Sequence, residues 1–337
     1  MQRCFQLAKL GNGFVAPNPM VGAVLVYDNS IIGEGFHQKY GEAHAEVNCI
    51  NSVKDEDKHL IAKSTLYVSL EPCAHYGKTP PCADLIIKNN IPKVVISVQD
   101  NFHLVNGKGI ERLEQNNIEV ITSVLEDEGK ELIKHFLFFQ QYKRPFITIK
   151  FAQSKDGFIG KKNEEIPISN ELSKRYVHQL RAEHQAILVG KNTVITDNPS
   201  LTVRYSNGKN PIRIILGNED EIPKNYNIFN QEATTLFIPS TNKQPLNIGT
   251  ILHQLYQKNI ISVLVEGGAN VLQQFIDADA WNEAHVITSN KNLVQHSTSN
   301  TAQYIKAPII IGSLHQTISL ENDSIQILKN KNVISNS

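Results

Sequence analysis

Short apolar runs alternate with longer amphipathic runs along the first 142 residues. The apolar runs predict strands at residues 21–27, 31–37, 65–70, 93–98 and 118–121, the first two forming a hairpin and the last an edge strand. The amphipathic runs predict helices at residues 1–10, 44–50 and 127–140, and two more that begin near residues 82 and 110. This alternation is typical of a layered α/β sheet.

A second alternating pattern begins after Lys143-Arg144-Pro145. It predicts strands at residues 146–151, 185–190, 211–216 and 260–265, and helices at 171–183 and 269–278. We therefore expect two domains, residues 1–142 and 143–337, in this chain of 337 residues. The last of these strands runs through Gly267 and Gly268 into a helix, a junction whose backbone N–H groups suit a phosphate. A plain strand-to-helix turn explains these glycines equally well.

Composition points to small-molecule partners. The 33 basic residues balance the 33 acidic ones, so bulk charge suggests neither nucleic acid nor a membrane surface. The N-terminal amphipathic run lacks a signal-peptide core, and no apolar run is long enough to span a membrane. Four cysteines do not form a disulfide framework, and we expect Cys4 and Cys49 to be buried apolar residues. We therefore expect a cytoplasmic protein.

One imidazole and two thiols stand near a carboxylate between residues 41 and 82. His44 lies two residues before Glu46, Cys73 follows the strand at 65–70, and Cys82 begins the next helix. Three protein ligands with a fourth position left for water are typical of a catalytic zinc site. A helix start also favours the thiolate form of Cys82, which a metal requires. We therefore predict zinc at His44, Cys73 and Cys82.

Glu46 is predicted to act on the water beside the metal. Residues two apart on a helix do not share a face, so His44 can bind zinc while Glu46 addresses the water. Zinc lowers the pKa of bound water to about 7, and a carboxylate can carry its proton to a leaving amine. The zinc deaminases share His-x-Glu but close with Pro-Cys-x-x-Cys, whereas residues 74–81 form a longer insert here. The alternative is a structural zinc site completed by His75 or Cys49.

Motifs in both halves carry a resemblance to one family. In the first half they are Pro17-Asn18-Pro19-x-Val21-Gly22, His44-Ala45-Glu46-Val47 and Leu70-Glu71-Pro72-Cys73-x-His75-x-Gly77-Lys78-Thr79-Pro80-Pro81-Cys82. In the second half they are Lys150-x-Ala152-x-Ser154-x-Asp156-Gly157, Leu180-Arg181-Ala182, Val189-Gly190-x-Asn192-Thr193-Val194-x-x-Asp197-Asn198-Pro199-x-Leu201-Thr202-x-Arg204 and Val265-Glu266-Gly267-Gly268. Over about residues 1 to 290 the chain closely resembles the bifunctional riboflavin-biosynthesis deaminase/reductase family.

The resemblance implies a two-step enzyme of α/β class. A cytidine-deaminase-like three-layer domain would use one zinc ion to hydrolyse the 2-amino group of 2,5-diamino-6-ribosylamino-4(3H)-pyrimidinone 5′-phosphate. A dihydrofolate-reductase-like domain would then use NADPH to reduce the ribosyl group to ribityl. We expect a small phosphorylated pyrimidine as partner and a homo-oligomer, with no nucleic acid and no membrane.

The resemblance also implies site residues. Asn18, His37, Lys78 and Thr79 are similar to deaminase substrate contacts, although Lys78 also fits an exposed lysine and His37 a packed side chain. Reductase substrate positions match Glu165, Arg181, Leu201, Arg204 and Glu266. NADPH positions match Gln153, Pro167, Thr193, Asp197, Gly267, Gly268 and Asn270. A solvated helix residue and a turn former remain the alternatives for Arg181 and Asp197.

The segment from Glu165 to Ser169 departs from the family pattern. The family usually carries Ser-x-Trp-Ile-Ser/Thr there, so Pro167 replaces a stacking tryptophan and Glu165 a hydroxyl that meets substrate. Two rival interpretations remain. One is a zinc deaminase of another nucleobase-type substrate with a non-catalytic second domain. The other is a zinc-stabilised sensor that binds a nucleotide without turnover.

Overall fold

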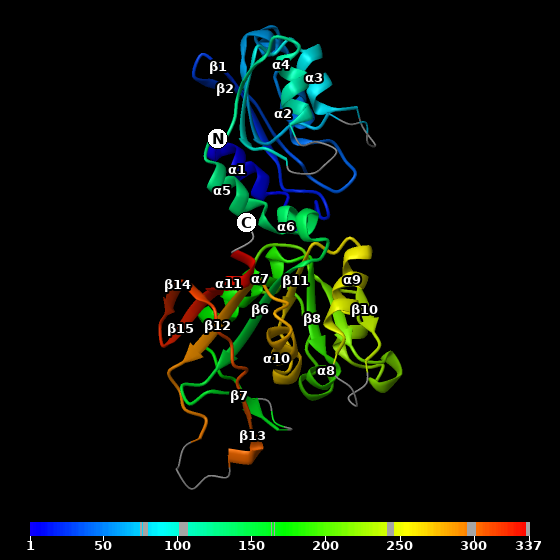
Figure 1. Cartoon of the computed structure of the whole chain (residues 1–337), viewed down its shortest axis with the longest axis vertical. Helices are drawn as coiled ribbons and strands as arrows, with labels where there is room; N and C mark the ends of the chain where they lie inside the picture. The colour runs from blue at the N-terminus through cyan, green and yellow to red at the C-terminus, as the bar shows by residue number, and fades with distance from the viewer. Residues whose placement is uncertain are drawn as a thin grey trace. The chain divides into compact units, whose positions relative to one another are not determined.

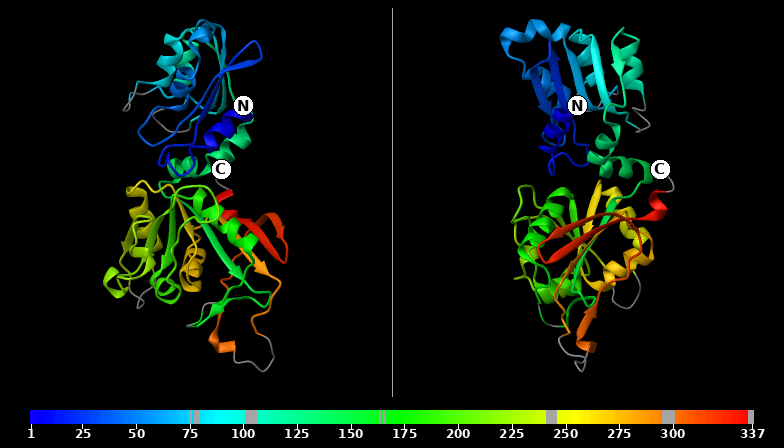
Figure 2. Two further views of the ribbon diagram at one scale, coloured as in Figure 1. Left: turned by 180° about the vertical axis from the view of Figure 1, so that it is seen from behind. Right: turned by 90° about the vertical axis from the view of Figure 1, so that its left-hand side faces the viewer.

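The computed structural model describes residues 1–74, 76, 80–100, 107–162, 164, 166–240, 246–294 and 301–334. The chain divides into two compact units, Met1–Lys143 and Arg144–Ser337, each with its own sheet (Figures 1 and 2). Within the described ranges no helix is long and apolar enough to cross a membrane.

The first unit is built on a five-stranded sheet in the order β2-β1-β3-β4-β5. The strands are β1 (Gly22–Tyr27), β2 (Ser30–Phe36), β3 (Thr65–Leu70), β4 (Lys93–Val98) and β5 (Glu119–Ile121). β1 runs antiparallel to β2 and β3, while β3, β4 and β5 are parallel. Asp28 and Asn29 form the hairpin turn with φ of 46° and 60°, the left-handed conformation that such tight turns need. All five predicted strands are confirmed, including β5 at the edge.

Helices on both faces make the first unit a three-layer structure (Figure 1). α2 (Ala45–Asn51), α3 (Cys82–Lys88) and α4 (Lys108–Glu114) share a core with β1, β3 and β4 on one face. α1 (Gln2–Lys9) and α5 (Glu126–Leu132) pack on the other face, α6 (Lys134–Tyr142) follows, and η1 (Asp55–Lys63) precedes β3. Cys4 and Cys49 are fully buried, as expected.

The single helix predicted over residues 127–140 is wrong. α5 and α6 are separate helices because Ile133 between them adopts φ −110° and ψ 21°, outside the helical region. The break lets Ile133 and Phe136 bury against Leu70 and Val98 near the ends of β3 and β4. Tertiary packing therefore overrides the amphipathic pattern at this position.

The second unit is built on an eight-stranded sheet in the order β10-β9-β8-β11-β6-β12-β15-β14. The strands are β6 (Phe146–Gln153), β8 (Ala186–Gly190), β9 (Ile212–Leu216), β10 (Thr235–Ile238), β11 (Ser262–Val265), β12 (Glu283–Ser289), β14 (Ser313–Leu320) and β15 (Asp323–Lys329). The strands from β10 to β12 are parallel, and β15 and β14 extend the sheet antiparallel. β7 (Phe158–Lys161) and β13 (Tyr304–Lys306) form a separate small sheet.

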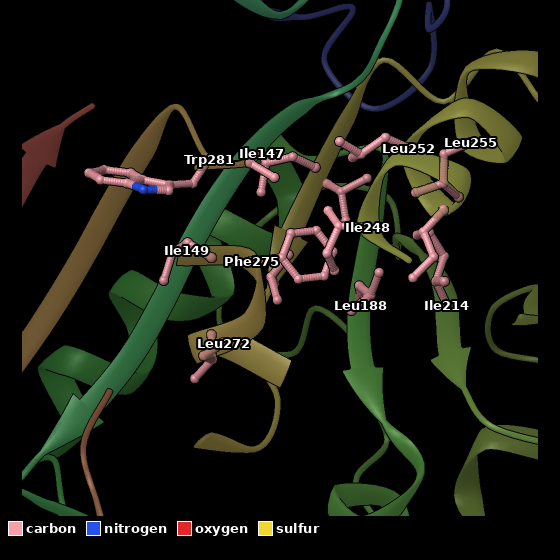
Figure 3. Close-up of a cluster of buried hydrophobic side chains, with 14 of the residues drawn as sticks. Ile147, Ile149, Leu188, Ile214, Ile248, Leu252, Leu255, Leu272, Phe275 and Trp281 are labelled. Carbon is pink, nitrogen blue, oxygen red and sulfur yellow. The ribbon is translucent and has the colours of Figure 1, made fainter. Parts of the chain in front are cut away.

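Successive side chains of β6 point to opposite faces of this sheet. Ile147, Ile149 and Phe151 join the largest core, which α9 (Ile248–Gln257) and α10 (Ala269–Asp277) cover. Figure 3 shows Ile147 and Ile149 beside Phe275 of α10. α7 (Glu171–Glu183) and α8 (Lys191–Asp197) pack on the opposite face. The remaining short elements are η2 (Glu219–Glu221), η3 (Asn227–Phe229), η4 (Thr301–Gln303) and α11 (Lys331–Ile334).

The predicted strands 146–151, 185–190, 211–216 and 260–265 and the helices 171–183 and 269–278 are confirmed. The sequence pattern did not predict α8, α9 or the strands β7, β10 and β12 to β15. Because β11 lies between β6 and β8 and all three are parallel, their carboxyl ends meet at one edge of the sheet. In open α/β sheets that edge is where ligands bind.

Candidate functional site

His44, Cys73 and Cys82 come together in the first unit. His44 is the residue before α2, Cys82 is the first residue of α3, and Cys73 follows β3. The His44 Nδ1 atom lies 3.6 Å from the Cys73 sulfur and 3.4 Å from the Cys82 sulfur. The ligand atoms of the three residues all lie within 4.8 Å of one another. The predicted helix starts therefore do converge on one place.

The distances fit a zinc ion. Tetrahedral coordination with Zn–N near 2.05 Å and Zn–S near 2.3 Å would place a nitrogen and a sulfur ligand about 3.6 Å apart. The two observed N to S distances, 3.6 and 3.4 Å, match this geometry. One imidazole and two thiolates are also ligands that zinc prefers. The three side chains thus form a zinc-sized site with three protein ligands.

The thiols interact strongly with each other and with His44. A hydrogen bond from Cys82 lowers the pKa of Cys73, while the same contact and burial raise the pKa of Cys82. The hydrogen bond to Cys73 also raises the pKa of His44. The backbone N–H of Cys82 donates to the Cys73 sulfur at 3.3 Å. Negative charge is therefore favoured on Cys73, as a metal ligand needs.

Glu46 is buried in the first turn of α2, with an exposed fraction of 3%. Burial raises its pKa to about 7, and the nearby Cys73 contributes to the increase. Gly35 of β2 permits this position of α2, because a Cβ at Gly35 would lie 2.2 Å from the backbone nitrogen of Cys49. Near pH 7 the carboxyl group beside the ligand cluster is thus present in both its protonated and its ionised form.

Asn18 and His37 lie beside the ligand cluster. The His37 and His44 rings meet edge to face with centroids 5.5 Å apart. His37 Nδ1 donates to the Ala43 carbonyl oxygen at 3.0 Å, so its Nε2 accepts from the Asn18 amide at 3.1 Å. His37 is 3% exposed, and burial lowers its pKa. The predicted deaminase residues Lys78 and Thr79 lie outside the described residues, as does the alternative ligand His75.

A buried ion cluster lies between α7 and the sheet of the second unit. Arg181 donates to both Glu266 carboxylate oxygens, at 2.7 and 2.9 Å, and to the Thr202 carbonyl oxygen at 3.2 Å. The Lys150 ammonium is 3.6 Å from the same carboxylate. Burial alone would raise the pKa of Glu266, but Arg181 and Lys150 lower it to about 2. Arg181 is therefore not a solvated helix residue.

Leu201 and Arg204 border this cluster. Leu201 is buried with φ of 52°, a strained conformation for this residue type, and Thr202 follows it. The backbone N–H of Arg204 donates to His178 Nδ1 at 2.9 Å, and the Arg204 side chain is exposed. Burial lowers the pKa of His178 to about 4, with Arg181 and Arg204 contributing. A neutral His178 and an exposed Arg204 therefore flank the buried ion pair.

The predicted cofactor residues Thr193, Gly267 and Gly268 lie together. A Cβ at Gly268 would lie 3.1 Å from Thr193 Oγ1, and a Cβ at Gly267 would lie 2.5 Å from the Val189 Cβ. Gly268 also has φ of 68° immediately before α10. The two glycines therefore let this turn pack closely against Val189 and Thr193 at the carboxyl ends of β8 and β11, where a helix start suits a phosphate group.

The other predicted cofactor residues are more scattered. Asn270 lies in the first turn of α10 and accepts from Gln274, and the exposed Asp197 ends α8. Gln153 ends β6 and donates to Thr288 at 3.1 Å. Pro167 is exposed ahead of α7. The predicted substrate residue Glu165 lies outside the described residues.

Known proteins share both halves of this arrangement. The family model for the cytidine and deoxycytidylate deaminase zinc-binding region matches residues 1–98, and that for the RibD C-terminal domain matches residues 145–293. The riboflavin biosynthesis protein RibD of Bacillus amyloliquefaciens is 37% identical over 352 residues, covering 98% of this chain and 89% of its own length. The chain belongs to the RibD family.

Other RibD proteins agree over similar lengths. That of Aquifex aeolicus is 39% identical over 295 residues and covers 82% of each chain. A solved deaminase/reductase from Thermotoga maritima is 34% identical, with a TM-score of 0.86 over 98% of this chain and 97% of its own. The expected cytidine-deaminase-like and dihydrofolate-reductase-like domains are thus confirmed.

RibD membership decides between the interpretations left open by the sequence. The chain is a bifunctional deaminase and reductase of riboflavin biosynthesis, with a zinc-binding deaminase domain and an NADPH-dependent reductase domain. A non-catalytic second domain and a non-enzymatic sensor both disagree with this finding.

Two residues in or beside the buried ion cluster received no site role in the sequence analysis. Lys150 and His178 both lie on the α7 side of the sheet, in contact with Glu266 and Arg204 respectively. Lys150 carried a signal, because a lysine between Ile149 and Phe151 interrupts a buried apolar strand. His178 carried no comparable signal in the sequence, because a histidine in an amphipathic helix can be either buried or exposed.

Proposed function

We propose that residues 1–142 deaminate 2,5-diamino-6-ribosylamino-4(3H)-pyrimidinone 5′-phosphate and that residues 143–337 reduce the ribosyl group of the product to ribityl. The solved Thermotoga maritima relative is named a diaminohydroxyphosphoribosylaminopyrimidine deaminase and 5-amino-6-(5-phosphoribosylamino)uracil reductase. The observation that carries the proposal is the zinc-sized cluster of His44, Cys73 and Cys82 with Glu46 buried beside it.

In the deaminase, His44, Cys73 and Cys82 would hold zinc, which supplies a Lewis acid that makes water nucleophilic near neutral pH. Glu46 takes the proton from the attacking water and delivers it to the departing amine. Its pKa of about 7 supports both roles, because the group can accept and donate near neutral pH. The proposal predicts that Glu46 acts without binding the metal.

Asn18 would orient the pyrimidine in the deaminase. Because the Asn18 amide nitrogen donates to His37, its carbonyl oxygen is oriented to accept from an amino group of the substrate. His37 keeps this orientation through its own bond to the Ala43 carbonyl. Lys78 and Thr79 remain proposed contacts to the substrate, the lysine to its phosphate.

In the reductase, Arg204 would bind the substrate phosphate with its exposed guanidinium group. The Arg181 guanidinium group already donates two hydrogen bonds to Glu266. We therefore propose that Arg181 holds this carboxylate in place while Glu266 and Lys150 face the substrate. Leu201, which is buried next to Thr202, and Glu165 remain proposed contacts. This assignment replaces the expected substrate contact of Arg181 with a role in positioning Glu266.

NADPH would lie at the carboxyl ends of β8 and β11. It supplies the hydride, so the chain needs only to bind and orient it. Gly267 packs against Val189, and Gly268, half-buried beside Thr193, comes immediately before α10, which supports a phosphate-binding role for this turn. Gln153, Pro167, Asp197 and Asn270 remain proposed contacts. Pro167 cannot stack as the family's tryptophan does, so we expect a weaker contact with the cofactor there.

The test follows ammonia release and NADPH oxidation separately. Glu46→Gln should lose ammonia release from the diaminopyrimidinone but still oxidise NADPH when given the deaminated intermediate. Glu266→Gln should show the reverse. Loss of both reactions in either variant, with the protein still folded, would contradict two independent sites. We also propose a cytoplasmic homo-oligomer, which light scattering of the purified protein and fractionation of cells would test.

A further inference from the structure

Glu71 is a buried carboxylate that the zinc chemistry does not use. It lies between β3 and Cys73, and its exposed fraction is 4%. Among the described residues its oxygens accept from four backbone N–H groups, those of Asp100 at 3.1 Å, Gly107 at 3.1 Å, Gly109 at 2.9 Å and Ile110 at 3.4 Å. The carboxylate therefore ties the segment before Cys73 to Asp100, two residues after β4, and to the beginning of α4.

A second contact fixes the same segment. A Cβ at Gly109 would lie 2.0 Å from the Pro72 carbonyl oxygen, so α4 packs directly on the backbone of Pro72. On its other side, the Cys73 carbonyl oxygen accepts from the Ala83 N–H at 3.1 Å. The backbone around Cys73 is thus held from both α4 and α3.

Cys73 depends on these contacts more than the other ligands do. His44 is anchored at the start of α2 and Cys82 within α3, so helical hydrogen bonds set their backbones. Cys73 follows the end of β3 at Leu70 and lies in no helix or strand. A ligand outside regular structure holds its place through specific contacts. Here these come from Glu71 and Pro72 on the α4 side and from the Ala83 and Cys82 N–H groups on the α3 side.

We propose that Glu71 is the positioning residue of the zinc site: its carboxylate anchors the Glu71-Pro72-Cys73 turn to α4 and thereby sets the Cys73 sulfur at ligand distance from His44 and Cys82. The inference rests on the proposed zinc ligands. It makes Glu71 part of metal binding although, among the described residues, the hydrogen-bond partners of its side chain are backbone N–H groups.

Glu71→Gln is the sharpest test. The substitution keeps size and shape, but the introduced amide places an NH₂ donor against two backbone N–H groups that now bond to one carboxylate oxygen. Zinc affinity, measured by competition with a chromogenic chelator, should fall about 10- to 100-fold, as when groups that support metal ligands are lost. With cobalt(II) in place of zinc, the thiolate-to-cobalt absorption band should weaken or shift.

Controls separate positioning from general stability. Asp323→Asn is a matched control, because Asp323 is a buried carboxylate of the second unit that accepts from Asn170 N–H and Ser173 Oγ, both at 2.7 Å. It should bind zinc with parental affinity. Glu71→Gln should in turn oxidise NADPH at the parental rate when given the deaminated intermediate. Gly109→Ala should weaken zinc binding as Glu71→Gln does, and it decides the question if the latter fails to fold.

The outcomes distinguish this inference from the zinc-site assignment. If Cys73→Ser loses zinc while Glu71→Gln and Gly109→Ala bind zinc with parental affinity and give the parental cobalt spectrum, the positioning role of Glu71 is wrong and the ligand assignment stands. An equal loss of affinity in Asp323→Asn would also overturn the positioning role. If Cys73→Ser binds zinc as tightly as the parent, the ligand assignment itself fails, and the inference fails with it.

Discussion

Replacing Glu266 with glutamine should destabilise the second unit by about 3 kcal/mol at pH 7. The pKa of Glu266 falls from an ordinary value of 4.5 to about 2 in the folded protein, because Arg181 and Lys150 outweigh the effect of burial. A pKa difference of about 2.5, at roughly 1.4 kcal/mol for each tenfold change, corresponds to about 3 kcal/mol. The group is buried, with a side-chain exposure of 7%, so solvent screens the interaction little.

The stabilisation depends on pH with a definite sign. The folded-state pKa of Glu266 is lowered, so the unfolded chain binds its proton first as the pH falls. The stability advantage of the parent over Glu266→Gln should be constant above about pH 5.5. It should decrease between pH 4.5 and pH 2, the interval between the two pKa values. Groups that do not interact with Glu266 titrate alike in both proteins and cancel in the difference, whereas His178, whose pKa Glu266 raises, adds its own change near pH 4.

Urea titration followed by tryptophan fluorescence measures this difference in the second unit. Trp281 is the one tryptophan of the chain and is buried in the core of the second unit, so its emission reports unfolding there. Glu219→Gln is the control, since its ion pair with Lys224 is exposed and should add little. A parent advantage below about 1 kcal/mol, or one that does not change with pH, would refute the reasoning.

Three further predictions concern the two sites. Chelation of zinc should abolish ammonia release and leave NADPH oxidation of the deaminated intermediate unchanged, measured on one sample; equal loss of both would contradict the account. Arg204→Ala should raise the KM for the phosphorylated substrate of the reductase about tenfold or more and leave the KM for NADPH unchanged, since a charge-assisted bond to phosphate is lost. Gly268→Ala should raise the KM for NADPH, because its φ of 68° and the 3.1 Å approach to Thr193 disfavour a Cβ; an unchanged value would remove this turn from the cofactor site.

The sequence singled out His44, Cys73 and Cys82, the three residues that the structure brings together. His44, Glu46 and Cys82 stand at helix starts, and a helix start can be read from prolines and the apolar period that follows. Cys73 follows β3, the strand that lies between α2 and α3 in the chain. Strands such as β6 and β11 were equally clear, because a parallel strand buried on both faces is a continuous apolar run.

The other strands and the ion cluster depend on contacts between distant residues, which the local sequence pattern does not contain. β12 contains buried polar residues, among them Glu283 and His285, so its sequence lacks the continuous apolar run that predicts a buried strand. β14 is an exposed edge strand with little apolar alternation. The ion cluster joins Lys150, Arg181 and Glu266 from three elements far apart in sequence, which only the sheet order brings together. Glu71 belongs to a motif quoted from the sequence, but its hydrogen-bond partners, among them the N–H groups of Asp100 and Gly109, lie much later in the chain.

The central claim is that one chain performs both reactions, deamination first. The most direct measurement gives the unmodified protein the diaminopyrimidinone ribosyl phosphate with NADPH and follows ammonia and NADPH in the same reaction. The account predicts one ammonia released and one NADPH consumed per substrate molecule, with ammonia appearing first. Ammonia release without any NADPH consumption would contradict the reductase assignment, and NADPH consumption before ammonia release would contradict the proposed order.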